Sequence, residues 1–157
     1  MIMDERLEFV DSYDFGAAAL GTGTDNVGDH IDLGHANRNP GRGYPLYLVI
    51  VVEETNDGGS GTTGDIQFML VSDSESPPAT DGSATVHLMT QVFNAGELIA
   101  GETYAYPIPA QTKPYERYLG LQSVVTDEEE DDLVFSAFLT VDPVGYFAYP
   151  DAANSNP

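Results

Sequence analysis

The sequence predicts an all-β protein, a jelly-roll-like antiparallel β-sandwich. Apolar residues recur in short runs, either with period two or as continuous β-branched stretches. Segments rich in Gly, Asn, Asp and Pro separate these runs at intervals of about 10 to 20 residues, and no helical apolar pattern persists for three turns. At 157 residues the chain is long enough to bury a core without disulfides, and it has no cysteine.

Residues 1–15 are predicted to form either an edge strand or an arm that becomes ordered on a partner. Leu7 and Phe9 are apolar with period two in this segment. Residues 16–43 are rich in Gly, Ala, Asn and Asp, which predicts a loop with one short extended piece at Asp29 to Leu33. Tyr44 to Val52 is continuously apolar, as in a strand in the middle of a sheet.

The middle of the chain is expected to supply three more strands. Asp65 to Val71 is predicted to return beside the preceding strand, and the polar loop Ser72 to Ser83 follows. Ala84 to Phe93 is the next strand, with Val86 on its core face. Thr103 to Ile108 is a short strand that ends at prolines.

Two strands near the C-terminus, Tyr115 to Val125 and Leu133 to Val141, each have an apolar face. The acidic block Asp127 to Asp132 separates them, so they are predicted to pair as an antiparallel hairpin with a solvated acidic tip. The sequence thus divides into the residues 1–15, one sandwich domain at 16–150 and a polar tail at 151–157.

The formal net charge of −21 excludes two classes of partner. Nucleic acids and anionic membrane surfaces are bound by clustered Lys and Arg, whereas this chain has one lysine and four scattered arginines. We therefore expect no nucleic-acid partner and no membrane partner. The N-terminus does not resemble a signal peptide, and no apolar run reaches the roughly 18 residues of a membrane helix, so we expect a soluble protein made in a cytoplasm.

No motif predicts catalysis or a cofactor. In DHIDLGH, Asp29 to His35, the two histidines fall on opposite faces of an extended segment, which opposes a shared metal ion. The block Asp127 to Asp132 lacks the spacing of a calcium-binding loop, and no nucleophile elbow or phosphate-binding glycine loop occurs. We expect no enzyme activity, no metal and no cofactor.

Arg117 differs from the other basic residues because it lies in a strand-like run between tyrosines. Its guanidinium can fork onto a carboxylate or stack on a ring, either within the fold or across a contact with another subunit. The sequence leaves both arrangements open.

Several segments, in order along nearly the whole chain, carry a family resemblance. They are the opening MIMDERLEFVDSYDF, IDLG from Ile31, YPLYLVIVVEE from Tyr44, PYERYLGLQ from Pro114, and a final strand that runs into Tyr149. In these segments the chain resembles the capsid cement (decoration) proteins of short-tailed, Bordetella-phage type bacteriophages. It departs from that pattern in the long loop at 16–43 and in the acidic block at 127–132.

The resemblance implies a β-sandwich on the outer surface of the phage head that bridges neighbouring major capsid protein subunits and stabilises the shell against DNA pressure. It also implies a homo-oligomer, a dimer or a trimer. We expect capsid or subunit contacts from basic and apolar residues outside the predicted strands, together with Arg117. These are Ile2, Met3, Arg6, Leu7, Phe9, Arg38, Arg42, Arg117, Tyr146, Phe147 and Tyr149.

Two alternatives share the predicted fold: a carbohydrate-binding β-sandwich module, and another virion structural protein such as a head fibre or tail component. A coplanar platform of tyrosines on one sheet face would favour carbohydrate binding. Tyrosines dispersed around subunit contacts would favour the cement role.

Overall fold

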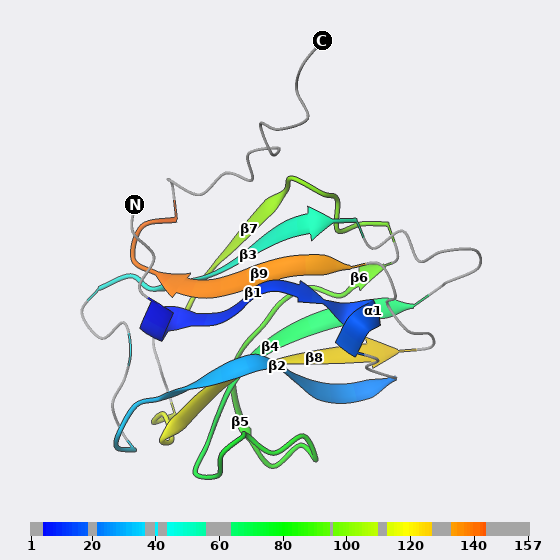
Figure 1. The fold of residues 1–157 in the computed structure, drawn as a ribbon. Coiled ribbons are helices and arrows are strands. Elements are labelled where there is room, and N and C mark those ends of the chain that lie inside the picture. The colour runs from blue at the N-terminus through cyan, green and yellow to red at the C-terminus, as the bar shows by residue number, and fades with distance from the viewer. Residues whose placement is uncertain are drawn as a thin grey trace.

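The computed structural model describes residues 5–18, 22–36, 40, 44–55, 64–94, 96–109, 113–126 and 133–143. Two antiparallel sheets lie face to face, and the helices among these residues are the short η1 (Glu5–Leu7) and α1 (Phe15–Ala18) (Figure 1). Sheet A has the order β1 (Glu8–Asp14), β9 (Val134–Thr140), β3 (Tyr47–Glu54), β7 (Thr103–Pro107). Sheet B has the order β2 (Gly23–Asp32), β8 (Tyr118–Thr126), β4 (Asp65–Asp73), β5 (Thr85–Met89), and β6 (Phe93–Asn94) also pairs with β4. The predicted β-sandwich is confirmed.

The strand pairing follows the jelly-roll pattern, in which one long hairpin wraps over itself. The pairs β1 with β9, β2 with β8, β3 with β7 and β4 with β5 are all antiparallel, so the chain doubles back at the connection from β4 to β5. Further ladders between β3 and β9 and between β4 and β8 join these ribbons into the two sheets.

The predicted hairpin of the two C-terminal strands is wrong. β8 lies in sheet B and β9 in sheet A, so their apolar faces meet across the core instead of sharing one sheet. The expectation that Asp65 to Val71 returns beside Tyr44 to Val52 fails in the same way, since β3 and β4 lie in opposite sheets. An apolar alternation with period two shows which face of a strand is buried. It does not show to which of the two sheets the strand belongs.

The predicted loop at 16–43 contains a long strand. β2 covers Gly23–Asp32 and pairs with β8 on both sides of a register shift between Val27 and His30. Val27 is the fully buried side chain of β2, whereas most of its other residues are polar. β2 is an edge strand of sheet B, and edge strands commonly carry polar and charged residues.

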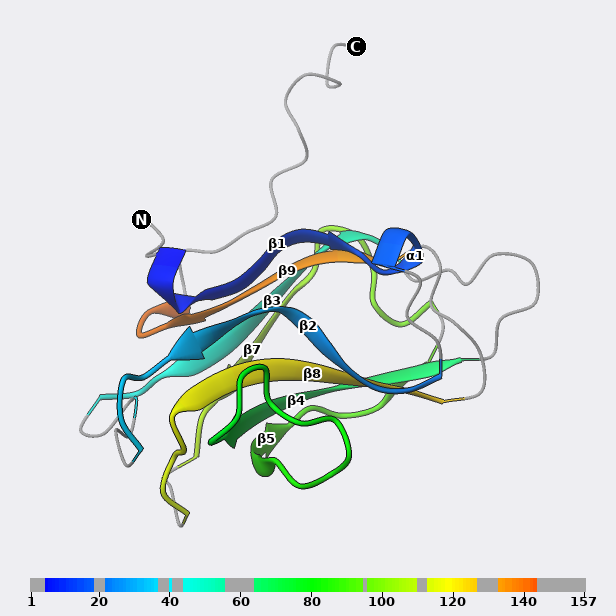
Figure 2. The same ribbon diagram turned by 60° about the horizontal axis from the view of Figure 1, so that its bottom comes forward.

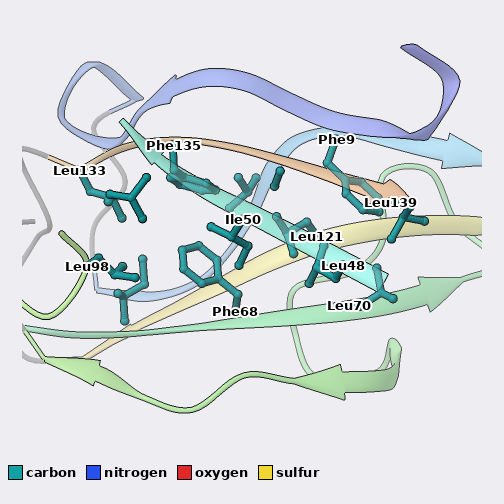
Figure 3. Close-up of a cluster of buried hydrophobic side chains, with 14 of the residues drawn as sticks. Phe9, Leu48, Ile50, Phe68, Leu70, Leu98, Leu121, Leu133, Phe135 and Leu139 are labelled. Carbon is teal, nitrogen blue, oxygen red and sulfur yellow. The ribbon is translucent and has the colours of Figure 1, made fainter. Parts of the chain in front are cut away.

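The core fills the space between the sheets (Figure 3). Phe68 of β4 and Phe135 of β9 meet there with ring centroids 5.0 Å apart, and both are fully buried. The other buried side chains labelled in the figure come from both sheets, from the connection before β7 and from the residue that precedes β9: Phe9, Leu48, Ile50, Leu70, Leu98, Leu121, Leu133 and Leu139.

Residues 5–14 belong to the sandwich. η1 packs against the end of β9, and β1 pairs with β9 at the edge of sheet A. β1 also approaches β2 closely where Gly28 has a φ of +65°. A Cβ at Gly28 would lie 2.3 Å from the carbonyl oxygen of Phe9 and 2.8 Å from Cβ of Val10. Glycine therefore lets the two sheets close at this corner.

The side-chain alternation predicted for β5 is wrong, because its register shifts against β4. Leu88 pairs with Leu70 and Val86 with Val71, so His87 is an extra residue, as in a β-bulge. His87 is buried and Leu88 packs against the core, whereas Val86 and Met89 are exposed. Val86 therefore does not face the core.

Candidate functional site: the basic end of the sandwich

The segments that carry the described Lys and Arg residues, η1 and the residues that precede β8, lie at one end of the sandwich, which we call the basic end (Figure 2). η1 lies there beside the end of β9, and β8 begins there next to the end of β2. Arg6, Lys113 and Arg117 are the Lys and Arg side chains of the described residues, and all three are exposed. Acidic residues including Asp32 and Glu116 accompany them, so the charge here is mixed.

The opposite end, which we call the acidic end, holds no Lys or Arg among the described residues. Asp14 and Glu54 both pair with Val134 at the start of β9, and Asp65 pairs with Thr126 at the end of β8. Glu53, Glu97 and Glu102 lie on neighbouring segments. Among the described residues, Lys and Arg therefore lie at one end of the strands together with several carboxylates, whereas the other end carries carboxylates alone.

Arg117 forms a two-bond ion pair with Asp32. Its Nε donates to Oδ1 at 2.9 Å and its Nη2 donates to Oδ2 at 2.8 Å, while the backbone N–H of Gly34 also donates to Oδ1. The hydrogen bonds from Arg117 are the main reason that the pKa of Asp32 falls to about 2. Both side chains stay nearly half exposed, so the pair contributes little to stability but holds the guanidinium at the surface.

Aromatic and loop contacts extend this pair across sheet B. The guanidinium carbon of Arg117 lies 4.9 Å from the ring centroid of Tyr118, and His30 packs edge-on against the same ring at 5.5 Å. Nε2 of His30 lies 2.8 Å from the hydroxyl of Ser76, in the loop after β4. That loop also packs Pro78 over Gly120 of β8, so three segments are tied together at the basic end.

Two apolar side chains on the sheet A side are exposed at the basic end. Tyr44 precedes β3 and is 75% exposed, and Val141 follows β9 and is 59% exposed. Leu7 is partly buried against the core. Phe9 is 2% exposed because it faces the core, so it is corrected from a contact residue to a core residue.

The structure thus places Arg6, Leu7 and Arg117 of the predicted contact residues at the basic end. The remaining predicted residues, Ile2, Met3, Arg38, Arg42, Tyr146, Phe147 and Tyr149, lie outside the described residues.

A buried polar cluster around Ser72 was not predicted from the sequence. The Ser72 hydroxyl lies 2.7 Å from Nε2 of His87 and accepts a hydrogen bond from the backbone N–H of Glu116. His87 stacks on Tyr115 with ring centroids 3.9 Å apart. Because Ser72 has no exposed surface, this Ser–His pair braces β5 against β4. The sequence did not indicate this cluster, because strict alternation places His87 on the outer face of β5, whereas the β-bulge turns its imidazole inward.

The described residues contain no group of three or more His, Asp or Glu side chains placed to hold a metal ion. They also include no helix of the length and hydropathy that crossing a membrane requires. The described tyrosines are dispersed: Tyr104 and Tyr106 pack against the core from β7, Tyr115 is buried, and Tyr118 lies against Arg117.

Comparison with known proteins yields one family. A family model described as Bbp16, a Bordetella phage protein family name, matches residues 15–130. No curated protein matches the chain. The matched region runs from α1 through β8 and into the acidic block, and it covers most of the chain. The protein therefore belongs to the Bbp16 family.

Proposed function

We propose that this protein is a capsid cement protein. It binds the outer surface of an icosahedral phage head, bridges neighbouring major capsid protein subunits and stabilises the shell against the pressure of packaged DNA. It acts as a homo-oligomer, without catalysis and without a cofactor. It is made in the host cytoplasm, and it meets neither nucleic acid nor membrane.

The observation that carries the proposal is the polarised sandwich of a phage-family protein. A rigid body with its described Lys and Arg at one end can lie on a shell with that end inward and its acidic end toward solvent. Screening limits repulsion between exposed charges to about 8 Å at physiological salt, so the mixed basic end can approach another protein surface. Several modest contacts on one body act together through their high effective concentration.

The tyrosines do not favour the carbohydrate-binding alternative, because a sugar platform needs exposed rings side by side on one face. Tyr104 and Tyr106 turn inward from β7, whereas Tyr44 is exposed at the basic end. A head fibre or tail component of the same fold would bind elsewhere on the virion, and a shell-binding measurement separates it from a cement protein.

The experiment is cosedimentation with purified empty phage shells. Lys113→Glu makes the net charge two units more negative at the basic end, and the double variant Ala100→Glu/Thr126→Glu makes the same change at the acidic end. We expect wild-type protein and the acidic-end variant to saturate the shells equally. Lys113→Glu should bind about tenfold more weakly, or ~1.4 kcal/mol. Absence of wild-type binding to shells would refute the cement role, and equal weakening by both variants would refute the assigned orientation.

A further inference from the structure

The outer faces of both sheets are covered near their centres. On sheet B, the connection from β4 to β5 lies over β8, where Pro78 packs on Gly120 and Gln122 is buried. On sheet A, the outward residues Val49 and Phe138 pair with each other and are 0% and 3% exposed. The most exposed apolar side chains of the described residues lie elsewhere, at the basic end.

Tyr44 and Val141 are the two most exposed large hydrophobic side chains of the described residues, at 75% and 59%. Tyr44 shortly precedes β3, and Val141 directly follows β9. Because Tyr47 of β3 pairs with Thr140 of β9, both exposed side chains lie at the ends of neighbouring strands of sheet A.

The end of β7 brings two exposed prolines to the same place. Pro107 pairs with Tyr47, and the backbone N–H of Ile108 donates to the carbonyl oxygen of Leu46 at 2.8 Å, so the residues around Pro107 run beside those that precede β3. Five exposed, uncharged residues thus gather at the ends of three adjacent strands, in a chain of net charge −21. We call them the proline patch: Tyr44, Pro45, Pro107, Pro109 and Val141.

Proline is distributed unevenly between the two ends of the molecule. The ten prolines of the chain all lie at or after the ends of β2, β4, β7 and β9, the strands that run toward the basic end. No proline follows β1, β3, β5, β6 or β8 before the next strand begins. Proline fixes φ and has no N–H, so a surface built with it has less freedom to lose on binding and fewer donors for an added strand.

We propose that the proline patch is a preformed docking surface for an apolar hollow on the folded major capsid protein, with the ring of Tyr44 at its centre. Tyrosine is enriched among the central residues of protein interfaces, because it supplies a large contact area with few torsions to fix. Lys113 is exposed and follows Pro109 in the same connection, so carboxylates beside the hollow complement that side of the patch. The inference deepens the proposed function and rests on it for the identity of the partner.

Cosedimentation with empty phage shells tests the patch. Tyr44→Ser removes the exposed ring, and Ile99→Ser is the matched control, because Ile99 is 49% exposed and lies between β6 and β7, in a connection at the acidic end. Tyr44→Ser should bind about tenfold more weakly than wild-type protein, and Ile99→Ser should bind like wild type, with both variants folded by circular dichroism. Wild-type affinity in Tyr44→Ser would overturn the patch alone, whereas absence of wild-type binding would refute the cement role and the assigned partner together.

The contribution of the prolines is tested by restoring backbone freedom. Pro45→Gly loosens the segment that carries Tyr44, and Ala100→Gly loosens an exposed segment at the acidic end by the same kind of change. Pro45→Gly should weaken shell binding about threefold, because freedom that proline had removed must now be lost on docking. Ala100→Gly should leave binding unchanged. Unchanged binding of Pro45→Gly would show that docking does not depend on a preformed surface.

The absence of cysteine allows the partner to be identified directly. Val141→Cys labelled with a benzophenone maleimide should be cross-linked to the major capsid protein when shell-bound samples are illuminated. Ile99→Cys with the same label should not be. Cross-linking of the Val141 variant to a second copy of this chain in place of the shell protein would overturn the proposal, as would equal coupling of the two variants to the shell.

Discussion

Replacing Gly28 with alanine tests how the two sheets are closed along β1 and β2. At a φ of +65° an alanine is strained by about 1–2 kcal/mol. The new Cβ would also lie 2.3 Å from a backbone oxygen of Phe9, far inside van der Waals contact, so β1 must move away. That movement loosens Phe9, whose full burial contributes about 1.5–3 kcal/mol. Together these effects predict a loss of about 3–4 kcal/mol in the free energy of unfolding.

Gly34→Ala is the matched control. Gly34 has a φ of +76°, and a Cβ there would have no atom within 4 Å, so it retains the backbone strain and removes the collision. Urea unfolding followed by circular dichroism should give a loss of about 1–2 kcal/mol for Gly34→Ala. The difference between the variants then measures the close approach of β1 to β2. Equal losses would refute the reasoning, since they would show that β1 yields without cost.

Three further predictions follow from the buried core and the ionisable groups. Burial raises the pKa of Tyr115 to about 12, so the phenol stays neutral in the folded state after it has ionised in the unfolded state. The free energy of unfolding should therefore fall as pH rises from 10 toward 12, by about 1.4 kcal/mol at pH 11. In alkaline unfolding, the variant Tyr115→Phe should not show this fall. Arg117→Ala removes the main hydrogen bonds that lower the pKa of Asp32, so an NMR titration should show that pKa rise from about 2 toward its ordinary value; an unchanged titration would mean that the pair does not form in solution. Phe68→Ala should lower the free energy of unfolding by about 3–5 kcal/mol, whereas Val141→Ala, at an exposed position, should change it by less than about 0.5 kcal/mol; similar losses in chemical denaturation would place Phe68 outside the core.

The sequence predicted the fold class because alternation reports which face of a strand is buried. The predicted apolar face of each C-terminal run is buried, with Phe135 and Leu139 of β9 and Leu119 and Leu121 of β8 in the core. Their sheet could not be assigned, since facing strands and neighbouring strands show the same alternation. β2 was not predicted because most of its residues are polar and show no apolar alternation. It is held in sheet B by its backbone pairing with β8.

The candidate site was predictable only in part, because it depends on which loops the fold gathers. Arg117 was recognised as unusual, but its pairing with Asp32 joins residues 85 positions apart, and no local pattern encodes that contact. The exposure of Val86 and the burial of His87 depend on one extra residue in β5, which shifts the alternation.

The pairing of the first strand with the last has a consequence for how the chain is made. Glu8 lies opposite Phe138, so β1 cannot form its hydrogen-bonded ladder until ribosomal synthesis has passed β9. Among the strand pairings of the described residues, β4 with β5 joins the residues nearest in sequence and β1 with β9 those farthest apart, and contacts of such long sequence separation are typical of slowly folding β proteins. A chain that stops before β9 therefore lacks the strand between β1 and β3, and η1 gains its contact with β9 only after that strand has been made.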